Sequence, residues 1–153
     1  MMKMRIAGGI LAVAALAGVT ACTSASQAAP TTSPTPAVTS EVPSETLTPL
    51  IEQALPNAPG KTFTSAIVDF PPGARAVPHR HGQAFVYAYV LEGSVRSSVD
   101  DNPVSTYRAG ENWVEQPGAH HPLTENVSTT DPAKLLVIFV SNTGDSLKVE
   151  DHQ

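Results

Sequence analysis

The chain has 153 residues, with nine Lys and Arg against fourteen Asp and Glu, so its formal net charge is −5 at neutral pH. An acidic chain with no Gly-rich phosphate loop is not expected to bind nucleic acid. Its single cysteine, Cys22, excludes an intrachain disulfide.

Residues 1–21 have the features of a secretion signal peptide. Lys3 and Arg5 precede an uncharged run of small and apolar residues from Ile6 to Val19. This run is shorter than the roughly 20 apolar residues that a transmembrane helix requires. It ends in Val19-Thr20-Ala21-Cys22, which resembles the lipobox of bacterial lipoproteins. The resemblance implies cleavage before Cys22 and attachment of a diacylglycerol to its sulfur.

A lipobox predicts an extracytoplasmic protein that is anchored to the bacterial cell membrane by lipid and does not span it. The alternative is an ordinary secreted protein, cleaved near Ala21 or Ala25, with a free thiol. Residues 22–49 are mainly Ser, Thr, Ala and Pro. Such a segment buries too little apolar surface to offset its ordering entropy, so it is predicted to be a disordered tether. Residues 50–153 then form one folded domain.

The domain is predicted to consist mainly of strands. A short helix is expected at Thr48–Leu55, and the signals beyond it are those of strands and turns. Predicted strands cover residues 62–70, 84–91, 94–99, 104–108 and 135–140, and extended segments run from 110 to the turn at 117–118 and from 122 to 127. Short strands separated by Gly and Pro turns are typical of an all-β sandwich or barrel.

Four of the five histidines lie in two clusters, His79-Arg80-His81 and His120-His121. Two histidines that are one residue apart on an extended chain point the same way. Neutral imidazole is the commonest metal ligand, so the clusters predict a metal site. The alternative is a chance grouping in exposed loops. His152 is expected to have no part in the site.

The stretches around both clusters resemble the two sequence motifs of the cupin superfamily. The first motif is matched by a glycine, a His-x-His five residues later and a closing glycine. The second is matched by a glycine, an inner glycine and a histidine. The matching residues are Gly73, His79, His81 and Gly93 in the first motif, and Gly110, Gly118 and His121 in the second.

The cupin resemblance implies an all-β fold, a jelly-roll-like double-stranded β-helix barrel. It also implies one divalent metal ion held by His79, His81 and His121. Imidazole ligands favour a transition metal, such as Fe, Mn, Ni, Cu or Zn, over Mg or Ca.

The chain departs from the first motif at the glutamate ligand. That glutamate would stand at position 86, where this chain has Val86, and no acidic residue occurs between His81 and Glu92. Gln83 has the same parity as the histidine pair and is a candidate fourth ligand or holder of a water; the alternative is an exposed loop glutamine. Three histidines without a carboxylate predict a net positive site that an anionic substrate or inorganic ligand could fill.

Parity with position 86 predicts that Val86 and Ala88 face inward, while Tyr87 and Tyr89 face outward. The small inner side chains either leave room for an apolar ligand or pack the core. Trp113 is a cavity wall or a core residue.

Two further residues are candidates near the second cluster. His120 is expected to lie behind the ligands, to contact substrate or to face solvent. Glu115 is an acid/base candidate, and the favoured alternative is a solvated carboxylate at a strand end.

Two functional hypotheses follow. The first is a lipid-anchored metal-binding cupin that acts on a small molecule as an oxygenase, lyase or isomerase. The second is a non-catalytic cupin that binds or senses a small ligand at the cell surface, which the missing glutamate favours. The outward Tyr87 and Tyr89 would suit a homodimer.

Overall fold

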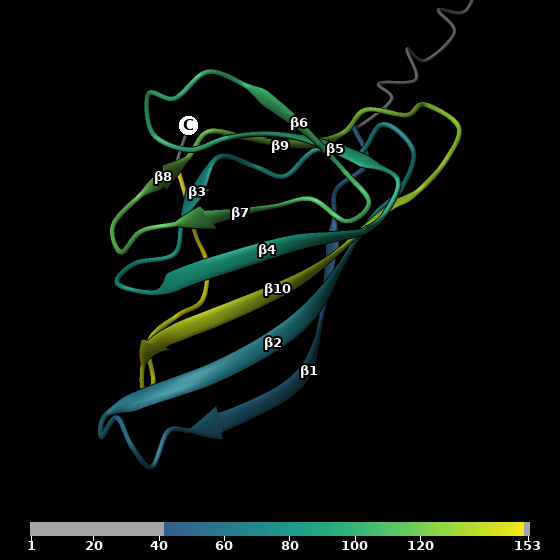
Figure 1. Ribbon diagram of the computed structural model, residues 1–153. Helices are drawn as coiled ribbons and strands as arrows, with labels where there is room; N and C mark the ends of the chain where they lie inside the picture. Colours follow the sequence, from purple (N-terminus) through teal and green to yellow (C-terminus); the bar gives the residue numbers. More distant parts are fainter. Residues whose placement is uncertain (1–41, 152–153) are drawn as a thin grey trace, which may run out of the picture. The chain divides into compact units, whose positions relative to one another are not determined.

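The computed structural model describes residues 42–151, which form eleven strands and no helix (Figure 1). A five-stranded antiparallel sheet has the order β1-β2-β10-β4-β7. Its strands are β1 (Thr46–Ala54), β2 (Lys61–Phe70), β10 (Ala133–Asn142), β4 (Phe85–Glu92) and β7 (Asn112–Glu115). Within the described residues, no helix is long and apolar enough to cross a membrane.

Two three-stranded sheets complete the fold and lie together on one side of the large sheet (Figure 1). One has the order β11-β3-β8, and the other has the order β6-β5-β9. Their strands are β11 (Val149–Glu150), β3 (His79–Arg80), β8 (His120–His121), β6 (Ser105–Arg108), β5 (Ser94–Ser98) and β9 (Leu123–Asn126). The predicted all-β, double-sheet architecture is confirmed.

The central strands alternate between buried and half-buried residues, because successive strand side chains point to opposite faces. Val86 and Ala88 are buried, whereas Tyr87 and Tyr89 on the other face are partly exposed, as parity predicted. The largest fully buried side chains come from both layers. They are Phe70, Phe139, Val86, Val90 and Val95.

The helix predicted at Thr48–Leu55 is wrong. Residues 46–54 form edge strand β1, which pairs antiparallel with β2 and has a register irregularity after Pro49. An edge strand tolerates a proline, whose missing N–H can face away from the sheet. Backbone pairing with β2 overrides the weak local helix preference. Residues 46–49 therefore belong to the folded sheet and not to the predicted tether.

Gly93, which closes the first motif, stands between β4 and β5 with φ +73°. A Cβ atom there would lie 2.7 Å from the carbonyl oxygen of Pro132. Both the left-handed backbone and the close approach therefore require glycine. Gly93 thereby allows the chain to run from β4 in the large sheet to β5 in a small sheet while its backbone lies close to the start of β10.

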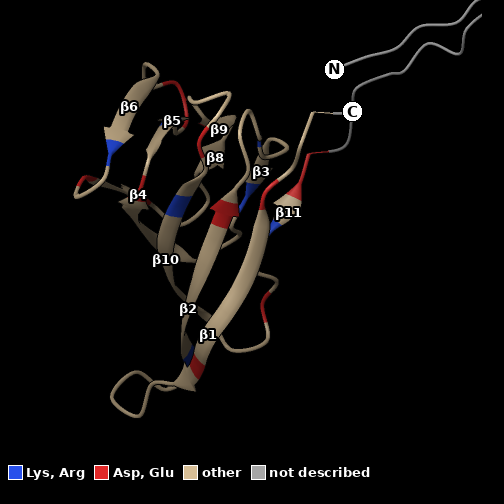
Figure 2. Cartoon of the chain, turned by 90° about the vertical axis from the view of Figure 1, so that its right-hand side faces the viewer, with Lys and Arg blue, Asp and Glu red and all other residues tan. Residues whose placement is uncertain are grey.

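Charged side chains are scattered singly over the strands (Figure 2). Several of them pair across strands, as Lys134 of β10 does with Asp69 of β2 at 3.3 Å. Arg96 of β5 pairs in the same way with Glu125 of β9. Such partly exposed pairs contribute little to stability, so the buried apolar layer holds the two sides together.

Candidate metal centre

Strand pairing brings the three motif histidines together. His79 in β3 lies directly opposite His121 in β8, so their side chains share one face of the small sheet. His81, two residues after His79, points to the same side. The ligand atoms of the three rings all lie within 4.8 Å of one another.

The rings of His79 and His81 are held through Nδ1. His79 Nδ1 lies 2.7 Å from the carbonyl oxygen of Val77, and His81 Nδ1 lies 2.5 Å from that of Leu147. A carbonyl oxygen only accepts hydrogen bonds, so both Nδ1 atoms carry the proton and donate it. In the neutral rings, each Nε2 then presents a lone pair. These two Nε2 atoms lie 3.1 Å apart.

Burial keeps both rings neutral. It lowers the pKa of His79 to about 4, against an ordinary value of 6.5. It also lowers the pKa of His81, although the carboxylate of Glu115 and the carbonyl of Leu147 act in the opposite direction. Neutral imidazole is the form that binds a metal ion, so the site is preset for that role.

His121 is oriented by two hydroxyl groups that the sequence did not single out. Its Nε2 lies 2.8 Å from Ser97 Oγ of β5 and 2.6 Å from Thr124 Oγ1 of β9. Its Nδ1 lies 3.1 Å from Glu115 Oε1 and 3.4 Å from Thr124 Oγ1. Serine and threonine are ordinary strand residues, so only the pairing of β5 with β9 reveals this contact.

Glu115 is not the solvated carboxylate that was favoured. It is 3% exposed, because in β7 it has the same parity as buried Trp113. Its Oε1 accepts a hydrogen bond from Trp113 Nε1 at 3.1 Å, and its Oε2 lies 3.5 Å from His81 Nε2. Burial raises its pKa, but contacts with His121, His81 and Trp113 outweigh burial, so the net pKa is lowered.

The ionised Glu115 reduces the positive charge expected at the site. A net positive site was predicted from three histidines without a carboxylate, yet the structure places a carboxylate beside two of them.

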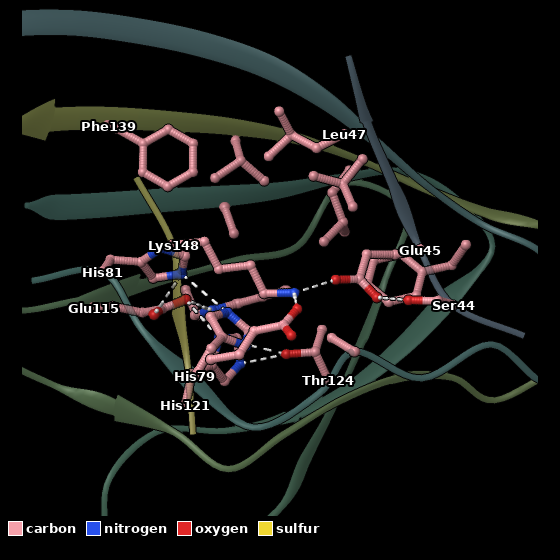
Figure 3. Close-up of a pocket in the computed structure, with 18 residues that line it drawn as sticks. Ser44, Glu45, Leu47, His79, His81, Glu115, His121, Thr124, Phe139 and Lys148 are labelled. Carbon is pink, nitrogen blue, oxygen red and sulfur yellow. Dashed lines mark hydrogen bonds and ion pairs between the residues drawn. The ribbon is translucent and has the colours of Figure 1, made fainter. Parts of the chain in front are cut away.

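The histidines line a cavity of about 250 Å³. This is slightly smaller than the roughly 300–1,000 Å³ typical of pockets for drug-sized ligands. Most of its wall is apolar and comes from the five-stranded sheet; it includes Leu47, Val68, Phe70, Ala88, Trp113, Leu135, Val137 and Phe139. The His and Glu115 side chains converge in one part of the cavity (Figure 3).

A second polar group also lines the cavity. Lys148 Nζ lies 2.6 Å from Glu45 Oε1 and 2.9 Å from Glu150 Oε1 (Figure 3). Glu45 and Leu47 come from the segment that the sequence assigned to the tether, so these wall residues were missed.

Residues 66–139 match the cupin domain family. The fold is that of a cupin. No curated protein sequence matches the chain. Among solved structures, the Cnp3 cupin domain of Schizosaccharomyces pombe is similar with a TM-score of 0.55 at 14% identity, over 65% of this chain and 62% of that one. An uncharacterized double-stranded β-helix protein from Klebsiella pneumoniae gives 0.56 at 15% identity, over 72% and 86%.

Oxalate oxidase in complex with the substrate analogue glycolate is similar with a TM-score of 0.55 at 25% identity. The match covers 72% of this chain and 57% of the oxidase, so this chain spans little more than half of that protein. Together with the family match, these structures support membership of the cupin superfamily.

The other predicted site residues fall outside the histidine cluster. Gln83 is exposed in the turn after His81 and does not line the cavity. His120 points away from His121, and its Nε2 lies 2.7 Å from Asp151 Oδ2. Val86 packs in the core, whereas Trp113 is both core residue and cavity wall. Cys22 and His152 lie outside the described residues.

The three clustered histidines fit a divalent transition metal. Atoms bound to one such ion at about 2.1 Å lie about 3.0–3.4 Å from their neighbours in octahedral or tetrahedral geometry. The 3.1 Å between the Nε2 atoms of His79 and His81 is in this range. Two lone pairs at this distance repel each other unless a cation or proton lies between them, and burial disfavours the proton.

Proposed function

We propose that this chain is a lipid-anchored, extracytoplasmic metal-binding cupin that acts on a small oxygen-bearing molecule as an oxygenase, lyase or isomerase. One observation carries the proposal: two neutral imidazoles present their Nε2 atoms 3.1 Å apart, beside a third histidine, in an apolar cavity. A cavity with one polar corner binds small ligands by enclosing an apolar body and holding a polar head.

His79, His81 and His121 would hold the ion, which could be Fe, Mn, Ni, Cu or Zn. When bound, such an ion supplies Lewis acidity or redox chemistry to an oxygen-bearing ligand. The chain's own contribution is orientation, since the carbonyls of Val77 and Leu147 fix two of the rings. Partners of this kind behind metal ligands set the tautomer and tune affinity.

The cavity favours an uncharged substrate with an apolar body. A divalent cation and Lys148 would be balanced by the three carboxylates of Glu45, Glu115 and Glu150 that line the cavity. A small dianion would add charge that the apolar walls cannot solvate. The similarity to oxalate oxidase supports the competing choice, a small carboxylate such as oxalate or glycolate.

The cellular location is inferred from the N-terminal sequence. The positive residues, the apolar run and the lipobox-like Val19-Thr20-Ala21-Cys22 support a lipid anchor on Cys22. Replacing Cys22 by Ser should release the protein from bacterial membranes into the soluble fraction. Unchanged fractionation of C22S would contradict the anchor.

The second candidate is a non-catalytic cupin that captures or senses a small ligand at the cell surface. Val86, a buried apolar residue at the family's glutamate position, favours this function. Both candidate functions require the metal ion. Catalytic turnover of a small-molecule substrate would identify the enzyme, and its absence would favour the binding protein.

The first experiment is metal analysis of the purified full-length chain after supplementation with each transition metal at neutral pH. About one ion per chain in wild type, and none in the H79A/H121A variant, supports the proposal. Wild-type protein without bound metal would contradict it. Oxygen uptake and product formation with oxalate, glycolate or catechol, an uncharged chelator with an apolar ring, would then identify an enzyme.

A further inference from the structure

We propose that Glu115 is the carboxylate ligand of the metal ion, and that strand β7 thereby supplies the group that the cupin motif would place at position 86 of strand β4. The inference rests on the proposed three-histidine metal site. It assigns the ion a ligand that the motif does not contain.

The sheet register explains how one position replaces the other. Val86 in β4 and Glu115 in β7 are direct partners in the antiparallel ladder. Directly opposed residues project from the same face of a sheet, with Cβ atoms about 5 Å apart. Both side chains are buried, at 1% and 3% exposure. The carboxylate absent from one strand is therefore present on its neighbour, at the same level of the barrel interior.

The distances fit a ligand set that includes this carboxylate. Glu115 Oε2 lies 3.5 Å from His81 Nε2, and Oε1 lies 3.1 Å from His121 Nδ1 (Figure 3). Neighbouring ligand atoms on one transition-metal ion are about 3.0–3.4 Å apart. The distance to His121 lies within this range, and the distance to His81 lies 0.1 Å above it.

One oxygen of Glu115 has no other use among the described residues. Oε1 accepts the hydrogen bond from Trp113, whereas Oε2 is buried with no hydrogen-bond partner. A buried, ionised oxygen without a partner costs several kcal/mol unless a cation compensates it. Oε2 lies 3.5 Å from His81 Nε2, and no hydrogen bond joins the two atoms. A metal ion between them supplies the missing positive charge.

The alternative is that Glu115 lies behind His121 and only orients it, with His121 Nε2 as the ligand atom. Nε2 is instead enclosed by hydroxyl groups, Ser97 Oγ at 2.8 Å and Thr124 Oγ1 at 2.6 Å. An orienting role would also leave Oε2 beside His81 unexplained. The geometry therefore favours direct ligation.

The test is Co²⁺ binding to the full-length protein, followed by visible absorption, because the d–d bands report the ligand set independently of activity. In E115Q, which preserves side-chain shape, affinity should fall by more than about 100-fold and the bands should change. Loss of a residue that only orients a ligand typically costs about 10- to 100-fold. The matched control is E92Q, an exposed carboxylate at the end of β4, which should bind as wild type does.

A relocated carboxylate provides a second arm. The double variant V86E/E115Q should recover affinity to within about 10-fold of wild type, because position 86 faces position 115. A merely structural role for Glu115 predicts no such rescue. If E115Q keeps wild-type affinity and bands while H79A loses them, the assignment of Glu115 is overturned and the histidine site stands. If H79A also binds normally, both proposals fail.

Discussion

At the scale of single residues, the site depends on side chains that are oriented before any metal binds. The backbone carbonyls of Val77 and Leu147 hold the two rings of the first motif. Hydroxyl groups hold His121 from the opposite small sheet. The entropic cost of orienting these rings is therefore met during folding, so a smaller cost opposes metal binding.

Buried His79 should make the metal-free protein less stable in acid. Its pKa is about 4 when folded and about 6.5 when unfolded, so the unfolded chain binds an extra proton between these values. Stability should fall as the pH drops from 6.5 to 4, with His79 contributing on the order of 3 kcal/mol. Urea unfolding of chelator-treated wild type and H79Q at pH 7 and pH 4.5 measures this. Equal pH dependence in both proteins would refute the contribution of His79.

The adjacent residues His120 and His121 should differ sharply in their effect on metal binding. His121 faces the cluster, whereas His120 contacts Asp151 on the other side of β8. Calorimetric titration with Zn²⁺ should show that H121A loses at least about 100-fold in affinity, whereas H120A changes affinity by less than about threefold. Loss of a residue that only supports a metal ligand rarely costs more than about 100-fold, so the larger loss would identify His121 as a ligand. Similar losses in both variants would mean that the pair acts as one unit.

The role of Glu115 could be read only in part from the sequence. Its parity with Trp113 in a short strand placed both on one face. Its position next to the Gln116-Pro117 turn favoured exposure instead. Glu115 is buried because β3 and β8 lie over it. The pairing of these two strands joins residues about forty positions apart, so a local sequence pattern does not reveal it.

At the scale of elements, two short strands do most of the positioning. Strands β3 and β8 have two residues each, yet their pairing sets His79 against His121. The longer strands were predictable because alternation over β4 and β10 is a local signal. Strand β1 was not, because its conformation comes from pairing with β2 and its own side chains are all exposed.

Gly93 gives a test of how the two layers are joined. G93A should lower the free energy of unfolding by more than G60A does. Both glycines have positive φ, at +73° and +76°, so both variants carry backbone strain of about 1 kcal/mol or more. Only at Gly93 would the new Cβ atom meet a backbone oxygen, at 2.7 Å. Chemical denaturation measures the free energy of unfolding of both variants. Equal losses in G93A and G60A would show that backbone strain alone accounts for the effect.

At the scale of the whole molecule, part of the cavity wall comes from a segment far from the motifs. Glu45 and Leu47 line it from the N-terminal side, and Glu45 pairs with Lys148 near the C-terminal end of the described chain. This contribution could not be predicted, because a Pro- and Thr-rich segment with isolated charges is typical of a linker. The long-range ion pair and the β1–β2 ladder define the segment as part of the domain.

Truncation tests this boundary. A protein lacking residues 1–41 should unfold at about the temperature of the full chain. A protein lacking residues 1–54 should unfold several degrees lower, because it loses the β1–β2 ladder and Leu47. Thermal unfolding followed by circular dichroism compares them. Equal melting temperatures for the two truncated proteins would mean that β1 contributes nothing to the domain.

The central claim is that this chain binds one transition-metal ion through His79, His81 and His121. The most direct measurement is a crystal structure of the metal-loaded protein, with anomalous scattering recorded at the absorption edge of the metal. A single anomalous peak within about 2.3 Å of one nitrogen each of His79, His81 and His121 is the predicted result. Metal-loaded crystals with no peak among these three rings would contradict it.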